Sequence, residues 1–311
     1  MENRMKNLIK IGLLLSIFLS ACTNIENTEE KPQVIVTLFP QYDMVRAIAQ
    51  DKVNVELLLP AGVEPHSYEP TPSTIININE SDLFIYTSDI METWINGLLS
   101  QLSNDGPIIV NSSNGVEYIS HTDEHEHEED NHETEYDPHF WLDPNNAKVM
   151  VNNITNGLVE MDPENETFYR QNETAYLDKL TELDNQWIDL FNRVKVKKII
   201  YGGHFAFGYL AYRFDVQILS PYTGYSPDAE PRVSALAELI DIMKQNDIQT
   251  IFYEELIDPK IARTISEQTN AKIEVLHAAH NLSSEDMAKG LTYFDIMEMN
   301  IEKLKEALKY E

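Results

Sequence analysis

The longest uninterrupted helical pattern in the chain lies near its middle and divides the sequence into two halves. Asp162-Pro163-Glu164 is a helix start signal, because a capping aspartate is followed by proline at the first helical position. No further proline or glycine occurs up to Val194, and large apolar residues recur at helical spacing. About 32 residues at ~1.5 Å each give a length near ~48 Å, more than one small lobe needs. The sequence therefore predicts a rigid helix, 162–195, that joins two lobes.

On either side of this helix, short β-branched runs alternate with amphipathic stretches. The strands expected before the helix are 34–38, 53–59, 83–86 and 107–110. The strands expected after it are 198–201, 216–219, 250–253 and 272–276, followed by an amphipathic helix at 291–308. Continuous apolar runs are typical of strands buried on both faces of a parallel sheet. We therefore expect two similar α/β lobes, 32–161 and 196–311, each a mostly parallel sheet flanked by helices.

The N-terminus has the pattern of a processing signal. Basic residues precede an apolar run, 11–19, that is too short to span a bilayer. Leu19-Ser20-Ala21-Cys22 resembles a bacterial lipobox, in which the cysteine is acylated; an ordinary secretory signal is the alternative. Cys22 is the only cysteine, so no internal disulfide is expected. We expect a signal peptide at 1–22, a polar tether at 23–31, and a lipid-anchored protein on the extracytoplasmic face of the cell membrane.

A net charge of −29 argues against nucleic acid or an anionic membrane surface as a partner. The charge attracts cations, although salt screens it over roughly 8–10 Å. Much of the acid lies in a low-complexity segment, 121–135, which we expect to be disordered. Its histidines are His121, His125, His127 and His132. Imidazole and carboxylate at this density can bind Zn²⁺ weakly, so we interpret the segment as an accessory metal loop rather than only a solvated acidic loop.

The other five histidines all lie in turns or loops, and most follow a predicted strand. They are His66, His139, His204, His277 and His280. Open α/β sheets bind ligands at the carboxyl ends of their strands, so these side chains are expected to meet between the lobes. Three or four neutral imidazoles suit tetrahedral Zn²⁺, whereas Mn²⁺ favours oxygen ligands. Because ligands must be deprotonated, we expect affinity to fall below about pH 6.5, the ordinary histidine value.

Three spaced segments, 62–70, 137–144 and 204–210, resemble the zinc/manganese solute-binding proteins of bacterial ABC importers. The resemblance covers nearly the whole mature chain, with the segments in the family's order. It implies two α/β lobes bridged by a rigid helix, capture of a free metal ion, and His66, His139 and His204 as ligands. Histidine at the third position is typical of zinc members, and glutamate of manganese members. The family's fourth ligand is usually a carboxylate after the last strand; here we expect His280, with His277 and then Glu254 as alternates, or water.

The resulting prediction is a monomeric, non-enzymatic protein that captures Zn²⁺ with high affinity and passes it to an ABC importer permease. Three alternatives stay open. The first is a manganese-binding member of the same family. The second is a zinc hydrolase with Glu69 or Glu254 as general base, although the chain has no His-Glu-x-x-His motif. The third is a surface adhesin whose zinc is only structural.

Overall fold

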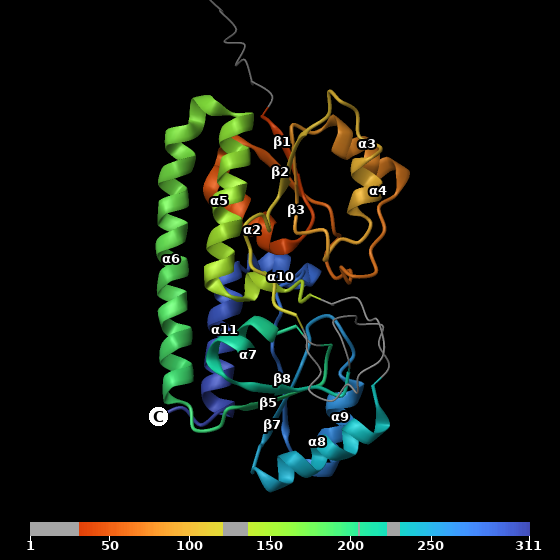
Figure 1. The fold of residues 1–311 in the computed structure, drawn as a ribbon, viewed down its shortest axis with the longest axis vertical. Coiled ribbons are helices and arrows are strands. Elements are labelled where there is room, and N and C mark those ends of the chain that lie inside the picture. Colours follow the sequence, from red (N-terminus) through yellow and green to blue (C-terminus); the bar gives the residue numbers. More distant parts are fainter. Residues whose placement is uncertain (1–30, 121–135, 205, 223–230) are drawn as a thin grey trace, which may run out of the picture. The chain divides into compact units, whose positions relative to one another are not determined.

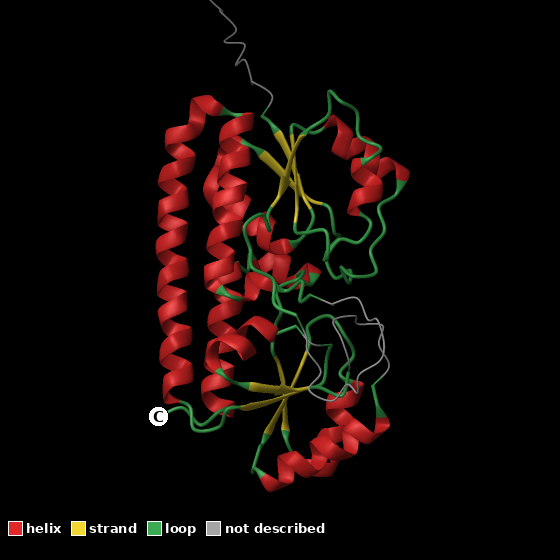
Figure 2. Cartoon of the chain, in the orientation of Figure 1, coloured by secondary structure: helices red, strands yellow, loops and turns green. Residues whose placement is uncertain are grey.

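The computed structural model describes residues 31–120, 136–204, 206–222 and 231–311, and within these ranges it contains two four-stranded parallel sheets (Figures 1 and 2). The expected signal peptide with Cys22, the expected tether up to residue 30 and the four histidines of 121–135 lie outside the described residues. Residues Pro32–Glu311 form one compact unit. No helix in the described ranges combines the length and the apolar character needed to cross a membrane.

The first sheet precedes the long helix and has the strand order β2-β1-β3-β4. Its strands are β1 (Gln33–Val36), β2 (Asn54–Leu57), β3 (Leu83–Tyr86) and β4 (Ile108–Asn111). The helices of this half are α2 (Phe39–Ala49), α3 (Pro72–Glu80), α4 (Ile95–Leu99) and α5 (Pro144–Met161). Strand β3 is buried at every position, as its unbroken apolar sequence predicts for an inner strand of a parallel sheet.

The second sheet follows the long helix and has the order β6-β5-β7-β8, which repeats the topology of the first. Its strands are β5 (Lys198–Tyr201), β6 (Gln217–Leu219), β7 (Thr250–Tyr253) and β8 (Lys272–Val275). The helices are α7 (Gly208–Phe214), α8 (Val233–Gln245), α9 (Lys260–Thr269), α10 (Ser284–Lys289) and α11 (Tyr293–Ala307). The prediction of two similar parallel α/β lobes is therefore confirmed.

Side-chain caps set several helix starts. Asp143 accepts a hydrogen bond from the amide of Asn145 and Pro144 occupies the first turn of α5, while the side chain of Thr292 accepts from the amide of Asp295 at the start of α11. Two short helices, α7 and α10, lack a periodic pattern long enough to be expected from sequence, and α4 has only five residues. Short helices depend on tertiary contacts more than on their own sequence.

The long helix, α6 (Glu166–Arg193), follows a 3₁₀ turn at Pro163–Asn165, so it starts a few residues later than predicted. It packs against α5 and α2 and also against α11, and it runs alongside both halves of the chain (Figure 1). One apolar cluster includes buried residues of both lobes and of α6. The rigid connecting helix is thus part of a shared core, and the exact domain bounds at 161/162 and 195/196 stay a prediction.

Candidate metal centre

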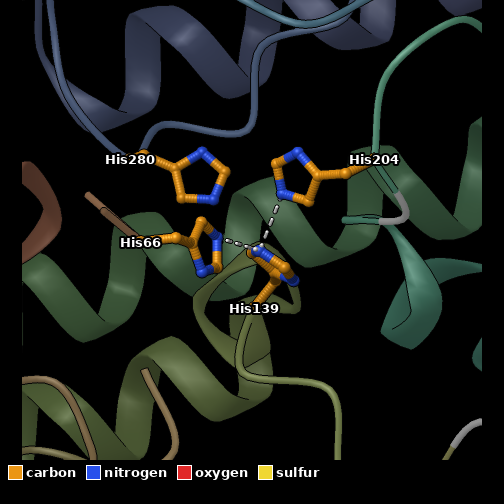
Figure 3. A group of neighbouring side chains, drawn as sticks. All are labelled: His66, His139, His204 and His280. Carbon is orange, nitrogen blue, oxygen red and sulfur yellow. Dashed lines mark hydrogen bonds between the residues drawn. The ribbon is translucent and has the colours of Figure 1, made fainter. Parts of the chain in front are cut away.

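Four histidines from the two lobes meet at one point (Figure 3). One ring nitrogen from each of His66, His139, His204 and His280 lies within 4.8 Å of the others. Nε2 of His139 lies 3.3 Å from Nε2 of His66 and 3.3 Å from Nε2 of His204. Three of the four side chains are buried and His66 is partly buried. The structure therefore brings together the four residues that the sequence ranked as its first choices.

His66 lies in the loop that follows β2. Both carboxylate oxygens of Glu64 accept backbone hydrogen bonds, one from His66 at 3.0 Å and one from Ser67 at 2.9 Å, which closes the turn. The side chain of Asn281, from the second lobe, donates to the carbonyls of Pro60 and Val63 at 2.7 and 3.0 Å. The loop that carries His66 is therefore fastened to the segment that carries His280.

His139 is held by Asp137, which lies two residues earlier. Oδ1 of Asp137 accepts from the backbone amide of His139 at 2.9 Å and lies 2.7 Å from Nδ1 of its ring. The ring is followed by a fully buried 3₁₀ turn, Phe140–Leu142, whose middle residue, Trp141, donates its indole N–H to the carbonyl of Ala278. Two independent contacts thus fix the ring: the carboxylate of Asp137 at Nδ1, and the buried apolar turn Phe140–Leu142 that holds the adjoining backbone.

His204 follows β5 at the carboxyl edge of the second sheet. Its Nδ1 lies 2.6 Å from Oε2 of Glu254, the residue that leaves β7 at the same edge. A Cβ at Gly203 would come within 3.0 Å of the Cβ of Glu254, closer than ordinary packing allows. Glycine at this position therefore permits the close approach of the two chain segments that hold the imidazole.

His280 follows β8, in a turn where Ala279 has a φ of +58°. Its Nδ1 lies 3.2 Å from Oε1 of Glu255, and its carbonyl accepts from the amide of Phe39 in the first lobe. Its Nε2 is buried and has no hydrogen-bond partner in the part of the chain that the structure describes. An unpartnered buried nitrogen costs free energy, so this atom points to a ligand.

Three of the four imidazoles, those of His66, His139 and His204, favour the neutral form. Burial, together with the neighbouring histidines, lowers the pKa of His66 to about 2 and holds the pKa of His139 well below its usual value. Burial also lowers the pKa of His204 to about 4, although nearby carboxylates oppose the shift. Burial raises the pKa of Glu254 to about 8. A neutral imidazole has one nitrogen with a free lone pair, so these rings can bind a cation at neutral pH.

The two alternates lie outside the group of four. Nδ1 of His277 accepts a hydrogen bond from the amide of Ala279 at 2.9 Å, so this ring closes the turn. Glu254 contacts His204 on the side of Nδ1.

The sequence analysis did not identify Asp137, Glu254 and Glu255 as supports of the histidine rings. The aspartate two residues before His139 was a usable signal, whereas the partnership between Glu255 and His280 has no local signature.

Comparison with known proteins agrees with this arrangement. The chain is 37% identical over 303 residues to the high-affinity zinc uptake system protein ZnuA of Bacillus subtilis, covering 94% of both chains. It is 34% identical to the zinc-binding lipoprotein AdcA of Streptococcus pneumoniae, over 97% of this chain but only 62% of the length of AdcA. The crystal structure of the Zn(II)-bound ZnuA-like domain of that AdcA superposes with a TM-score of 0.76 at 32% identity, covering 89% of this chain and 99% of the domain.

The family model for the periplasmic zinc-uptake complex component A, ZnuA, matches residues 34–307, nearly the whole described chain. The matched range includes all four histidines of the cluster and, apart from Gln33 at the start of β1, both sheets. With two like lobes, a shared core and imidazoles converging between them, the chain belongs to the ZnuA family of periplasmic zinc-uptake components.

Proposed function

We propose that this protein captures one Zn²⁺ ion between its lobes, outside the cytoplasm, and delivers it to the permease of an ABC importer. The observation that carries the proposal is the convergence of four imidazoles, from His66, His139, His204 and His280, in a nearly closed site. The names of the relatives, which describe zinc uptake and zinc binding, support the same cargo. In this proposal each of the four histidines supplies one nitrogen to the ion.

The spacing of the nitrogens supports zinc. A tetrahedral ion with Zn–N distances of ~2.0–2.1 Å requires its nitrogens to lie about 3.3–3.4 Å apart. Two of the nitrogen pairs in the cluster are separated by 3.3 Å, one between His139 and His66 and the other between His139 and His204. An all-nitrogen site offers no oxygen, which Mn²⁺ prefers. We therefore place the protein in the zinc-binding branch of the family.

The remaining parts of the chain have supporting roles in the proposal. Acylated Cys22 anchors the protein to the outer face of the cell membrane, and the polar tether lets the body reach the permease. The four histidines of 121–135 raise the local zinc supply. Deleting 121–135 should leave one tight zinc per chain and reduce uptake only when zinc is scarce. Loss of the tight site in that deletion would reject the accessory role.

A zinc hydrolase is the alternative from another functional class. It requires an open coordination position and a free general base next to it. A fourth imidazole fills that position here, the carboxyl group of Glu254 already contacts His204, and Glu69 is exposed. These contacts favour binding over catalysis. Zinc-dependent turnover of an ester or peptide by the purified protein would support the hydrolase instead.

The proposal is tested by metal analysis of the purified mature protein, followed by titration of the metal-free form. We expect one Zn²⁺ per chain, bound too tightly for direct titration and measured by competition with a chelator. A large excess of Mn²⁺ should not displace it. Metal-free protein should remain folded and rebind zinc, which separates a cargo from a structural ion such as the adhesin alternative requires. Preferential retention of Mn²⁺, or unfolding on metal removal, would contradict the proposal.

A further inference from the structure

Glu255 is a buried carboxylate that contacts both the ring and the backbone of the segment bearing His280. It follows Glu254 at the end of β7 and is only 7% exposed. Oε2 accepts from the amide of Ala278 at 2.7 Å, and Oε1 accepts from the amide of His280 at 3.3 Å. Oε1 also lies 3.2 Å from Nδ1 of the His280 ring. One side chain therefore connects strand β7 to the whole turn that follows β8.

The hydrogen bonds around Glu255 determine which nitrogen of His280 carries the proton. His277 also approaches Glu255, at 3.3 Å, but its Nδ1 already accepts from the amide of Ala279 and carries no proton in the neutral ring. Nδ1 of His280 is therefore the nitrogen that donates to Glu255. A neutral imidazole has one N–H, so Nε2 of His280 retains its lone pair. This is the buried atom that has no partner in the described part of the chain.

The hydrogen bonds that Glu255 accepts strengthen this arrangement. Both of its carboxylate oxygens face backbone amides, Oε2 that of Ala278 and Oε1 that of His280, and an amide N–H can only donate. An ionised carboxylate accepts hydrogen bonds only, so it cannot turn a donor toward either ring. A charge-assisted hydrogen bond at Nδ1 makes Nε2 a better donor to a metal and fixes the direction of the ring.

We propose that Glu255 is a positioning residue for the fourth zinc ligand: it selects the tautomer of His280 and fixes the turn that aims Nε2 at the ion. The inference rests on the zinc capture proposed above. Asp137 and Glu254 contact the rings of His139 and His204 in a similar way. Glu255 differs because it also holds two amides of a turn in which Ala279 adopts a left-handed conformation that needs outside support.

The test is a double-mutant cycle on zinc affinity, measured by chelator competition with Glu255→Gln, His280→Ala and the double variant. Loss of such a supporting contact typically weakens metal binding about 10–100-fold. We expect Glu255→Gln to cause a loss of that size in the wild-type background and almost none in the His280→Ala background. The visible absorption of the Co²⁺-loaded Glu255→Gln protein should shift toward that of His280→Ala, because both alter the fourth ligand.

Glu173→Gln is the matched control, since Glu173 is equally buried, at 7% exposure, but lies on α6 beside Arg170. It should leave the affinity and the Co²⁺ spectrum unchanged. If Glu255→Gln does not fold, Glu255→Asp, which keeps the charge but shortens the reach, takes its place in the cycle.

Three results would overturn the inference while zinc capture stands. These are unchanged affinity in Glu255→Gln, an equal loss in both backgrounds, and full affinity in His280→Ala, which would leave a three-histidine site. Failure of the wild-type protein to bind zinc tightly would instead reject the proposed function itself. The cycle thus separates a role through His280 from a general effect on the fold.

Discussion

Nε2 of His139 lies 3.3 Å from Nε2 of His204, although the two side chains belong to different lobes. Two lone pairs at this separation repel each other unless a proton or a cation lies between them. His139 makes a second contact of the same length with His66, so its Nε2 is the nitrogen shared by both close pairs. The ring is completely buried and is backed by Asp137, so it cannot turn away without breaking a buried hydrogen bond.

The first prediction follows from this central position of His139. His139→Ala should weaken zinc binding by more than about 100-fold, beyond the ~10–100-fold typical of a supporting contact, because it removes a proposed ligand. His125→Ala, in the acidic segment, should leave the affinity of the tight site unchanged. Chelator competition on the two purified variants measures the difference. Equal effects would remove the distinction between a rigid site and an accessory loop.

The second prediction separates the two histidines that follow β8. His280→Ala removes a proposed ligand, whereas His277→Ala removes the acceptor for the buried amide of Ala279. We expect His280→Ala to lose more zinc affinity than His277→Ala. We expect His277→Ala to cost about 1–3 kcal/mol of stability, the usual cost of a buried donor left unpaired. Chelator competition measures the zinc affinity, and urea unfolding of the metal-free proteins measures the stability. A greater loss of zinc affinity in His277→Ala would make His277, rather than His280, the fourth ligand.

The third prediction concerns pH and the metal-free protein. The pKa of His66 is lowered to about 2, mainly by burial, while an unfolded histidine titrates near about 6.5. Below about pH 6.5 the unfolded chain therefore binds a proton that the folded chain does not, so stability is lost as pH falls. His66 should contribute a loss of about 1.4 kcal/mol per pH unit.

A comparison with His66→Gln isolates this contribution, because Glu254, with its pKa raised to about 8, acts in the opposite direction in both proteins. Urea unfolding should show that the free energy of unfolding falls more steeply between pH 6.5 and pH 5 in the wild type than in His66→Gln. If this free energy fell equally steeply in both proteins, the pKa of His66 would not be lowered by folding. The same shifts revise the expectation that zinc affinity falls below pH 6.5: for His66 and His204, proton competition begins at lower pH.

The sequence predicts the parts of this protein that depend on local pattern. The runs 83–86 and 198–201 match β3 and β5 residue for residue, because continuous apolar segments bounded by polar residues have few other buried arrangements. The parallel order then brings the carboxyl ends of β5 and β7 to one edge, which is why a histidine placed after β5 could be expected near the site.

The contacts between distant segments could not be predicted in this way. Glu255 and His280 meet in a turn after β8 where Ala279 has a positive φ. Alanine rarely adopts this conformation, so the sequence does not predict it. Likewise, Tyr209 donates its hydroxyl to the carbonyl of Asp137 across the two lobes, and neither residue lies in a pattern that indicates the other. The sequence therefore indicates which side chains could bind the metal, while the support behind each ring depends on tertiary geometry.

The last prediction concerns the ion pairs that join the lobes away from the histidines. Arg213, on α7, lies 2.9 Å from Asp143 at the start of α5 and 2.5 Å from Asp184 on α6. Arg213→Met keeps much of the side-chain volume but leaves two largely buried carboxylates without their cation. We expect a loss of about 1–3 kcal/mol in the free energy of unfolding, below the ~3–5 kcal/mol of a fully buried pair because Arg213 is 23% exposed.

Arg263→Met is the control, because Arg263 pairs with Asp258 where both side chains are about half exposed. An exposed ion pair contributes little, so this variant should stay within about 0.5 kcal/mol of the wild type. Urea unfolding of the metal-free proteins measures both. Since Arg213 contacts none of the four histidines, Arg213→Met should still bind one zinc per chain. If Arg213→Met were no less stable than Arg263→Met, the lobes would be held by their shared apolar core, and the charged junction would contribute nothing measurable.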